Sequence, residues 1–279
     1  MDVKPVLYNS GASEEPGTPD PDYIRFIQNI KRSTGIDLSD YKEAQMKRRL
    51  TTLRVKNGYS SFAEFFEALQ KDKRLFHEFL DRMTINVSEF WRNPNRWEVL
   101  RDVILPELTA GARSRLKVWS AACSTGEEPY TLAMILDGKG LLQTSTLVAT
   151  DIDEGALAKA KQGLYLERSL KDVPKEVAAR YFSQEGPMYK FSEGLKANVQ
   201  FRKQNLLTDT FEQNHDLIVC RNVMIYFTEE AKAKLYHKFA SALRPGGYLF
   251  VGSTEQIFTP GQYGLEPTET FFYRKKADA

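Results

Sequence analysis

Apolar residues recur with the spacing of a helix through the first third of the chain. The first predicted helix begins near Asp22, and Gly35 can end it. Its apolar face is formed by Tyr23, Phe26, Ile27 and Ile30. A second helix is predicted from about Ser39 to Asn57, and two shorter amphipathic segments follow it. Because no strand signal interrupts these helices, we expect residues 21–84 to form a small all-helical domain.

After Leu116 short apolar runs alternate with amphipathic helices. Strands are predicted at 116–121, 147–150, 199–203, 217–220 and 248–251. Helices are predicted at 127–136, 154–162 and 228–243, the last ended by residues 244–247. Such alternation favours parallel pairing with right-handed crossovers, so the fold class is α/β, a doubly wound, mostly parallel, Rossmann-like sheet. This domain is expected over residues 85–279.

One region, at about 163–198, interrupts the alternation. Residues 174–182 have a helical pattern, and residues 188–191 are predicted to form a short strand. We therefore expect a small inserted β subdomain there. At the other end of the chain, residues 1–20 are small, polar and proline-rich, which is typical of a flexible tail.

Composition narrows the class of protein. The apolar runs are too short to cross a membrane, and the N-terminus has no apolar signal core, so a cytoplasmic protein is expected. Two cysteines fit a reducing compartment, and the three scattered histidines share no ligand spacing with them, so no metal is expected. A net charge of +2 does not demand a nucleic-acid partner.

Small side chains at 121–126 connect the first strand of the sheet to a helix that opens with Glu127 and Glu128. A capping box between Thr125 and Glu128 is an alternative interpretation, and for this segment alone it is the better one. However, two carboxylates at a helix N-terminus disfavour a pyrophosphate. They suit a ligand with a positive end, such as the ammonium or sulfonium of S-adenosylmethionine. The pattern therefore favours a methyltransferase over a nicotinamide-dependent dehydrogenase.

Polar residues also follow the later strands, at the edge where doubly wound sheets bind ligands. Asp151 is placed to accept hydrogen bonds from ribose hydroxyls. Asp153 is the competing candidate, with capping of the next helix as its alternative role, and Asp151 is preferred because it lies nearer the strand end. Asn205 can bind the adenine amine while Leu206 packs on the ring, although a simple turn asparagine fits equally well. An Arg-Asn pair at 221–222 is unusual for a mere connection.

Asn86, Ser88 and Arg92 recur at spacings of two and four before the sheet begins. This spacing can place them on one side of a bend, where Arg92 can pair with a carboxylate through two hydrogen bonds. Aromatic residues at 90–91 in the same segment are expected in the core.

Five blocks of the sequence together resemble the chemotaxis receptor glutamate methyltransferase family. They are residues 86–92, 119–130, 151–153, 205–206 and 220–227. The blocks occur in the family's order, and the likeness covers about residues 22–275. It implies a class I methyltransferase that esterifies glutamate side chains of methyl-accepting chemotaxis receptors and converts S-adenosylmethionine to S-adenosylhomocysteine.

The resemblance also implies the residues of the site. The cofactor site would be lined by Asn86, Ser88, Arg92, Glu128, Asp151, Asn205, Leu206, Arg221 and Asn222. Arg92 and Tyr226 would lie near the transferred methyl group. Ser88 departs from the threonine of many members but keeps the hydroxyl. The insertion is shorter than in enteric members, where it binds a receptor-tail pentapeptide by strand addition, so we expect no dependence on that tether.

The second helix has a surplus of positive charge, with six basic and two acidic residues between Asp40 and Lys56. On a helical wheel its cations form two stripes: Lys42, Arg49 and Lys56, and Lys47 with Arg54. A solvated basic face is the ordinary interpretation. Since receptor methylation helices are acidic, we expect these five residues to dock the receptor, with RNA as a weaker alternative. The main alternative function is a signalling module that binds the cofactor without methylating receptors.

Overall fold

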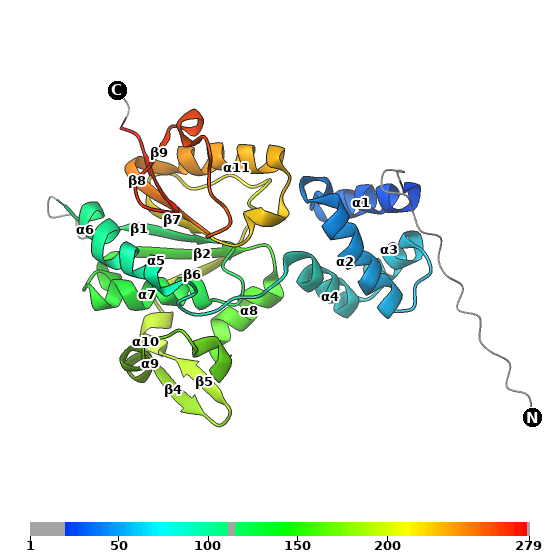
Figure 1. The fold of residues 1–279 in the computed structure, drawn as a ribbon. Helices are drawn as coiled ribbons and strands as arrows, with labels where there is room; N and C mark the ends of the chain where they lie inside the picture. The colour runs from blue at the N-terminus through cyan, green and yellow to red at the C-terminus, as the bar shows by residue number, and fades with distance from the viewer. Residues whose placement is uncertain (1–19, 111–114, 278–279) are drawn as a thin grey trace, which may run out of the picture.

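The computed structural model describes residues 20–110 and 115–277. Figure 1 shows a group of N-terminal helices beside a larger sheet domain, with a small second sheet projecting from the larger domain. The predicted tail at 1–20 lies outside the described residues except for Asp20. That residue is the N-cap of the first helix, where its carboxylate accepts hydrogen bonds from the backbone N–H groups of Asp22 and Tyr23.

The N-terminal domain packs its helices around aromatic side chains. Its elements are α1 (Pro21–Thr34), η1 (Leu38–Asp40), α2 (Glu43–Lys56), α3 (Phe62–Lys71) and α4 (Lys73–Thr84). Phe26 lies at the centre, with ring centroids 5.0 Å from Phe62 and 5.8 Å from Phe65. Gly35 ends α1 with φ +75°, a left-handed conformation that glycine adopts without steric cost. The all-helical prediction for this region is confirmed.

The main sheet has seven strands in the order β6-β2-β1-β7-β8-β10-β9. The strands are β1 (Lys117–Ala121), β2 (Thr146–Asp151), β6 (Val199–Lys203), β7 (His215–Cys220), β8 (Leu243–Val251), β9 (Leu265–Pro267) and β10 (Phe272–Lys275). The first five in this order pair in parallel, and β10 pairs antiparallel with β8 and β9. The doubly wound, mostly parallel sheet is therefore confirmed.

The helices of the sheet domain are α7 (Glu127–Gly138), η3 (Leu142–Thr144), α8 (Glu154–Gln162), η5 (Met224–Tyr226), α11 (Glu229–Ala242) and η6 (Pro260–Tyr263). The last helix ends at Ala242, one residue before its predicted end, but the strand that follows begins earlier than predicted. Residues 244–247 already belong to β8, whose pairing with β7 shifts register between His215 and Leu217. The two antiparallel strands β9 and β10 were also not predicted.

Helical turns not predicted from the sequence lead into the sheet: α5 (Pro94–Val99), η2 (Leu100–Ile104) and α6 (Leu105–Leu108). Trp97 from α5 is buried, with its ring centroid 5.4 Å from that of Phe250 on β8. This contact fixes the segment that carries Arg92 against the sheet.

The predicted insertion forms a three-stranded antiparallel sheet in the order β3-β5-β4. Its elements are β3 (Leu164–Leu166), η4 (Glu167–Leu170), α9 (Lys175–Tyr181), β4 (Phe182–Glu185), β5 (Met188–Phe191) and α10 (Glu193–Lys196). Phe90 anchors it to the linker between the domains, with ring centroids 4.7 Å from Tyr165 and 5.0 Å from Phe182.

The helical domain contacts the loop that follows β7. Tyr41 and Phe227 form an antiparallel bridge with ring centroids 5.1 Å apart. The N–H of Lys42 donates to the Tyr226 carbonyl at 2.9 Å, and the N–H of Thr228 donates to the Asp40 carbonyl at 2.8 Å. Among the described helices, none has both the length and the apolar character needed to cross a bilayer.

Candidate functional site

A cavity with about 930 Å³ of empty space, its open mouth included, lies at the carboxyl ends of the parallel strands. It reaches from the sheet to the linker and the helical domain. Its lining includes all ten predicted cofactor and methyl-site residues: Asn86, Ser88, Arg92, Glu128, Asp151, Asn205, Leu206, Arg221, Asn222 and Tyr226. These side chains come from segments far apart in the sequence, so the fold brings them together.

The loop between β1 and α7 turns through three residues with positive φ: Ala122 (+61°), Ser124 (+49°) and Gly126 (+98°). Gly126 is the N-cap of α7. A Cβ at this position would lie 2.9 Å from the Cβ of Ala160, so glycine is required both for the backbone angle and for the close packing on α8. The loop thereby directs the start of α7 toward the cavity.

The capping box between Thr125 and Glu128 is not formed. Since Gly126 is the N-cap, the Thr125 hydroxyl instead donates to Glu127 Oε2 at 2.7 Å. Glu128 Oε1 accepts from the Ser120 hydroxyl on β1 at 2.8 Å, and the Glu128 side chain lines the cavity. Of the two neighbouring carboxylates, Glu128 therefore lines the cavity and Glu127 does not.

Glu128 is poised to oppose a positive charge. Burial raises the pKa of this carboxyl to about 7, although the Arg221 guanidinium and the Ser120 hydroxyl pull it the other way. Burial away from water disfavours the ionised form of the Glu128 carboxyl, and a cation in the cavity would favour that form again. This response fits a ligand that carries an ammonium or sulfonium group.

Asp151, at the end of β2, holds the cavity wall together. Its Oδ2 accepts from the Ser124 N–H at 2.8 Å, and its Oδ1 accepts from the Asp153 N–H at 2.9 Å. Burial raises its pKa to about 6. Asp153 caps α8 as expected, accepting from the N–H groups of Gly155 and Ala156. Of these two aspartates, only Asp151 lines the cavity.

Asn86 fastens the linker to two loops of the sheet domain. Its Nδ2 donates to Asp153 Oδ2 at 2.7 Å, and its Oδ1 accepts from the Ser124 hydroxyl at 3.0 Å. Ser124, which the sequence reasoning did not single out, therefore contacts both Asn86 and Asp151. The spacing of small residues in its loop was the available signal.

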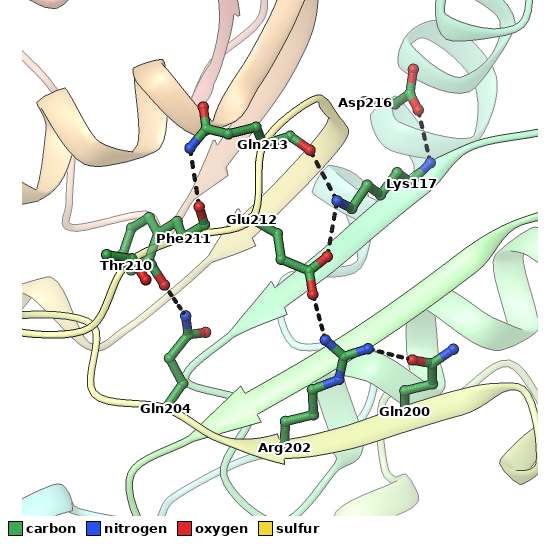
Figure 2. A network of polar contacts seen from close by, with 9 residues as sticks. All are labelled: Lys117, Gln200, Arg202, Gln204, Thr210, Phe211, Glu212, Gln213 and Asp216. Carbon is green, nitrogen blue, oxygen red and sulfur yellow. Dashed lines mark hydrogen bonds and ion pairs between the residues drawn. The ribbon is translucent and has the colours of Figure 1, made fainter.

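Asn205 and Leu206 lie on a loop that polar contacts hold against the sheet. Asn205 does act as a turn asparagine, because its Oδ1 accepts a hydrogen bond from the Leu207 N–H at 3.0 Å. The second lone pair of this oxygen can still accept a hydrogen bond from a ligand. Figure 2 shows how the following segment is anchored: Glu212 pairs with Lys117 of β1 at 2.9 Å and with Arg202 of β6.

A lysine on α11 completes this attachment. Lys238 Nζ donates to the carbonyls of Leu206 at 2.6 Å and Asp209 at 2.8 Å, and it lies 4.1 Å from the Phe211 ring centroid. Lys238 was not predicted from the sequence. Its two backbone acceptors fix the position of the loop that carries Asn205.

Arg221 and Asn222 follow β7. The Arg221 guanidinium lies over the rings of Trp97 and Phe250, 4.9 Å and 4.8 Å from their centroids, and donates to the Arg92 carbonyl at 2.7 Å. Asn222 has φ +61°, and its Oδ1 is buried without a hydrogen-bond partner among the described residues. A buried acceptor at the cavity wall fits a ligand that donates a hydrogen bond, such as an ammonium group.

Of the two residues expected near the transferred methyl, Tyr226 lies where the cavity meets the helical domain, and Arg92 lines the cavity from the linker. The Arg49 guanidinium of α2 lies 4.8 Å from the Tyr226 ring centroid. The Arg92 guanidinium forms no ion pair with any residue in 20–110 or 115–277, so it is available to an acidic group. A basic helix thus contacts the tyrosine of the predicted methyl site.

The five predicted docking residues separate in the structure. Lys47 pairs with Asp20 at 2.9 Å, Lys56 pairs with Glu78 at 2.8 Å, and the Arg54 guanidinium lies 4.9 Å from the Phe62 ring centroid. These three therefore make contacts within their own domain. Lys42 and Arg49 lie beside Tyr226.

A second hollow adjoins the cavity and shares Ile85, Asn86 and Val87 with its wall. Its other lining residues are Arg48, Arg49, Thr52, Asp81 and Arg82. The sequence reasoning missed Arg48 and Arg82, because a helical wheel does not show which stripe the neighbouring helix covers. No group of three or more metal-ligating side chains is arranged for a metal ion in the part of the chain that the structure describes.

Comparison with known proteins matches almost the whole described chain. Residues 21–84 match the family model "CheR methyltransferase, all-alpha domain", and residues 86–272 match "CheR methyltransferase, SAM binding domain". The "Chemotaxis protein methyltransferase" of Listeria monocytogenes is 45% identical over 254 residues, which cover 91% of this chain and 97% of the relative. Its counterpart in Borreliella burgdorferi is 34% identical over 266 residues, covering 90% and 93%.

Proposed function

Because the chain belongs to the CheR methyltransferase family, whose members use S-adenosylmethionine, we propose that it forms methyl esters on glutamate side chains of chemotaxis receptors. The observation that carries the proposal is the convergence of all ten predicted side chains on one cavity at the carboxyl edge of the sheet. The proposal places the enzyme in the cytoplasm, with residues 21–84 as its receptor-docking domain and residues 85–279 as its catalytic domain.

The cofactor site assigns one task to each side of the cavity. Glu128 opposes the positive end of the cofactor, and the unpartnered Asn222 Oδ1 accepts a hydrogen bond from it. Asp151 accepts from the ribose hydroxyls, while Asn205 and Leu206 hold the adenine. When bound, S-adenosylmethionine supplies the methyl group and is left as S-adenosylhomocysteine. No metal takes part in this proposal.

The protein's own contribution to the chemistry is alignment and exclusion of water. A glutamate carboxylate is already ionised near neutral pH, since its ordinary pKa is about 4.3, so no general base is needed. The unpaired Arg92 guanidinium orients the incoming carboxylate, and the Tyr226 ring shapes the channel through which it approaches. Fixing the reactants in line and removing water from them accounts for the rate enhancement.

The acceptor enters over the hollow that joins the cavity. Three guanidinium groups, from Arg48, Arg49 and Arg82, line this hollow, and the methylation helices expected as substrate are acidic. Arg49→Glu should raise the KM for receptor, most strongly at low salt, because charge steering weakens as salt is added. Arg54→Glu should instead lower the melting temperature, since its guanidinium packs on Phe62 within the domain.

Direct transfer of methyl groups tests the function. Purified protein is incubated with methyl-labelled S-adenosylmethionine and receptor-containing membranes, and the product is then treated with mild base. Base-labile label on the receptor supports a carboxyl ester. Stable label, or cofactor binding without transfer, would favour another acceptor atom or the binding-only module. Arg92→Ala and Tyr226→Ala should both reduce turnover at saturating cofactor; unchanged turnover in both would remove their assigned roles.

We further propose that docking does not depend on a receptor-tail pentapeptide, because the inserted sheet joins β4 to β5 by a short turn around Gly186. Titration of the isolated pentapeptide by calorimetry tests this. No binding is expected, and an affinity in the micromolar range would contradict the proposal.

A further inference from the structure

A buried carboxylate lies at the tip of β8, behind the cavity lining. Glu255 is 4% exposed. Its Oε2 accepts hydrogen bonds from the N–H of Asn222 at 2.6 Å and from the N–H of Gly252 at 2.8 Å, and its Oε1 accepts from the N–H of Ile225 at 3.3 Å. One side chain therefore joins the ends of β7 and β8.

The neighbouring glycine is required by this arrangement. A Cβ at Gly252 would overlap Glu255 Oε2 and would lie 2.9 Å from the backbone nitrogen of Asn222. No other residue leaves room for the carboxylate. Gly252 thus leaves the space that the Glu255 carboxylate occupies.

The backbone bound by Glu255 is the segment that presents two site residues. The backbone of Asn222 has φ +61°, in the left-handed region that residues other than glycine seldom adopt. From there the chain runs through η5 (Met224–Tyr226) to Tyr226, and both Asn222 and Tyr226 line the cavity. Glu255 itself does not line it, although its charge raises the pKa of Glu128. Removing that charge would favour ionised Glu128 and strengthen the binding of a cation, so a loss of binding on substitution must pass through this turn.

We propose that Glu255 is a positioning residue for methyl transfer, whose carboxylate fixes residues 222–226 and thereby directs the Asn222 amide and the Tyr226 ring into the cavity. This inference rests on the proposed function, since it takes Asn222 to bind the cofactor. Burial raises the pKa of Glu255, and its backbone donors, with Met224 as a fourth, oppose that shift by favouring its ionised form. A carboxylate that only stabilised the fold would change the melting temperature and leave binding and turnover unchanged.

A double-mutant cycle separates the two roles. Glu255→Gln keeps the size of the side chain but replaces one acceptor oxygen with a donor, and Asn222→Ala removes the amide that the turn is held to present. The matched control is Glu269→Gln, which changes an exposed carboxylate in the same C-terminal region. The dissociation constant of S-adenosylhomocysteine is measured by calorimetry, and kcat is measured at saturating S-adenosylmethionine.

We expect Glu255→Gln to weaken binding about tenfold and to lower kcat by a similar factor, with the control unchanged. The double variant should bind about as well as Asn222→Ala, because residues that act through one another are not additive. Losses that multiply in the double variant would overturn the inference, as would a change in melting temperature alone. If Asn222→Ala and Glu128→Gln both leave binding unchanged, the proposed cofactor site fails, which is a separate result.

Hydrogen exchange of the wild-type protein gives a test that does not depend on the variants folding. In the cofactor-free protein, the amides of Asn222, Ile225 and Gly252 should be protected to the level of the β7 amides. Exchange at the rate of exposed loops would mean that the carboxylate does not hold the turn, and the inference would be abandoned.

Discussion

Replacing Glu128 by glutamine is the sharpest test of the cation-binding site. Glu128 lies in the first turn of α7, accepts from Ser120 and faces the cavity, so the substitution removes its charge with little change of shape. A hydrogen bond to a charged group contributes about 1.5–3 kcal/mol, so at pH 8 we expect S-adenosylhomocysteine to bind about ten- to a hundredfold more weakly.

The pH dependence of binding follows from the pKa of about 7 that burial gives the Glu128 carboxyl in the cofactor-free protein. A bound ammonium favours the ionised carboxylate, so the pKa falls on binding. The affinity of the wild-type protein should therefore reach a plateau above about pH 8, be about twofold weaker at pH 7 and about tenfold weaker at pH 6, as protonation of Glu128 competes with binding. The gap between Glu128→Gln and wild type should correspondingly shrink from pH 8 to pH 6. Asp151, with a pKa of about 6, should leave a residual decline of about twofold at pH 6 in the variant.

Calorimetric titration of S-adenosylhomocysteine at pH 6, 7 and 8 measures both effects. Glu154→Gln is the matched control, because that carboxylate also lies in the first turn of a helix, pairs with Lys203 at the surface and does not line the cavity. A wild-type affinity that does not change over this range would refute the reasoning. So would a loss in Glu128→Gln that stays the same at every pH.

Three further predictions concern single side chains. Lys238→Met should raise the KM for S-adenosylmethionine about tenfold and leave kcat nearly unchanged in steady-state assays, because it releases the loop that carries Asn205. Gly126→Ala should lower the free energy of unfolding by about 1–3 kcal/mol in urea titrations and weaken cofactor binding, since alanine fits neither φ +98° nor the contact with Ala160. Phe26→Ala should cost about 3–5 kcal/mol of unfolding free energy, because Phe26 is buried among other rings; a loss below about 1 kcal/mol would contradict the packing.

Much of the sheet domain could be predicted from the sequence, because apolar residues recur with different periods in strands and in helices. The carboxyl ends of parallel strands also meet at one edge of the sheet. From that rule the sequence predicts Asp151, Asn205 and the pair at 221–222 at one edge of the sheet, and the structure places all of them around one cavity. The helices at 94–108 could not be found in the same way. Their apolar residues follow no single period, since a π-helical turn at Leu100–Ile104 shifts the pattern midway.

Orientation within an element was harder to predict than the element itself. The helical wheel of α2 grouped Arg54 with the docking cations, yet α3 supplies Phe62 and the preceding loop supplies the Ser60 carbonyl to bind its guanidinium. The capping-box interpretation failed for a related reason. Whether Glu128 turns to Thr125 or to Ser120 depends on the positive φ of Gly126, which hydrophobic pattern does not encode.

Arg221, Glu128 and Arg92 give the cavity lining charges of both signs, and Glu255 adds a negative charge behind it. Arg221, whose guanidinium lies over two aromatic rings and donates to the Arg92 carbonyl, is held in place independently of any ligand, and its charge opposes the effect of burial on Glu128. Without it, burial would raise the pKa of Glu128 further and leave the carboxyl neutral when the cofactor arrives. The Arg221 guanidinium thus keeps Glu128 able to ionise near neutral pH. Because Glu128 is buried, it becomes fully ionised at this pH only when a cation lies beside it. That balance favours a positively charged ligand over a neutral adenosine, and so makes the electrostatics of the cavity part of its selectivity.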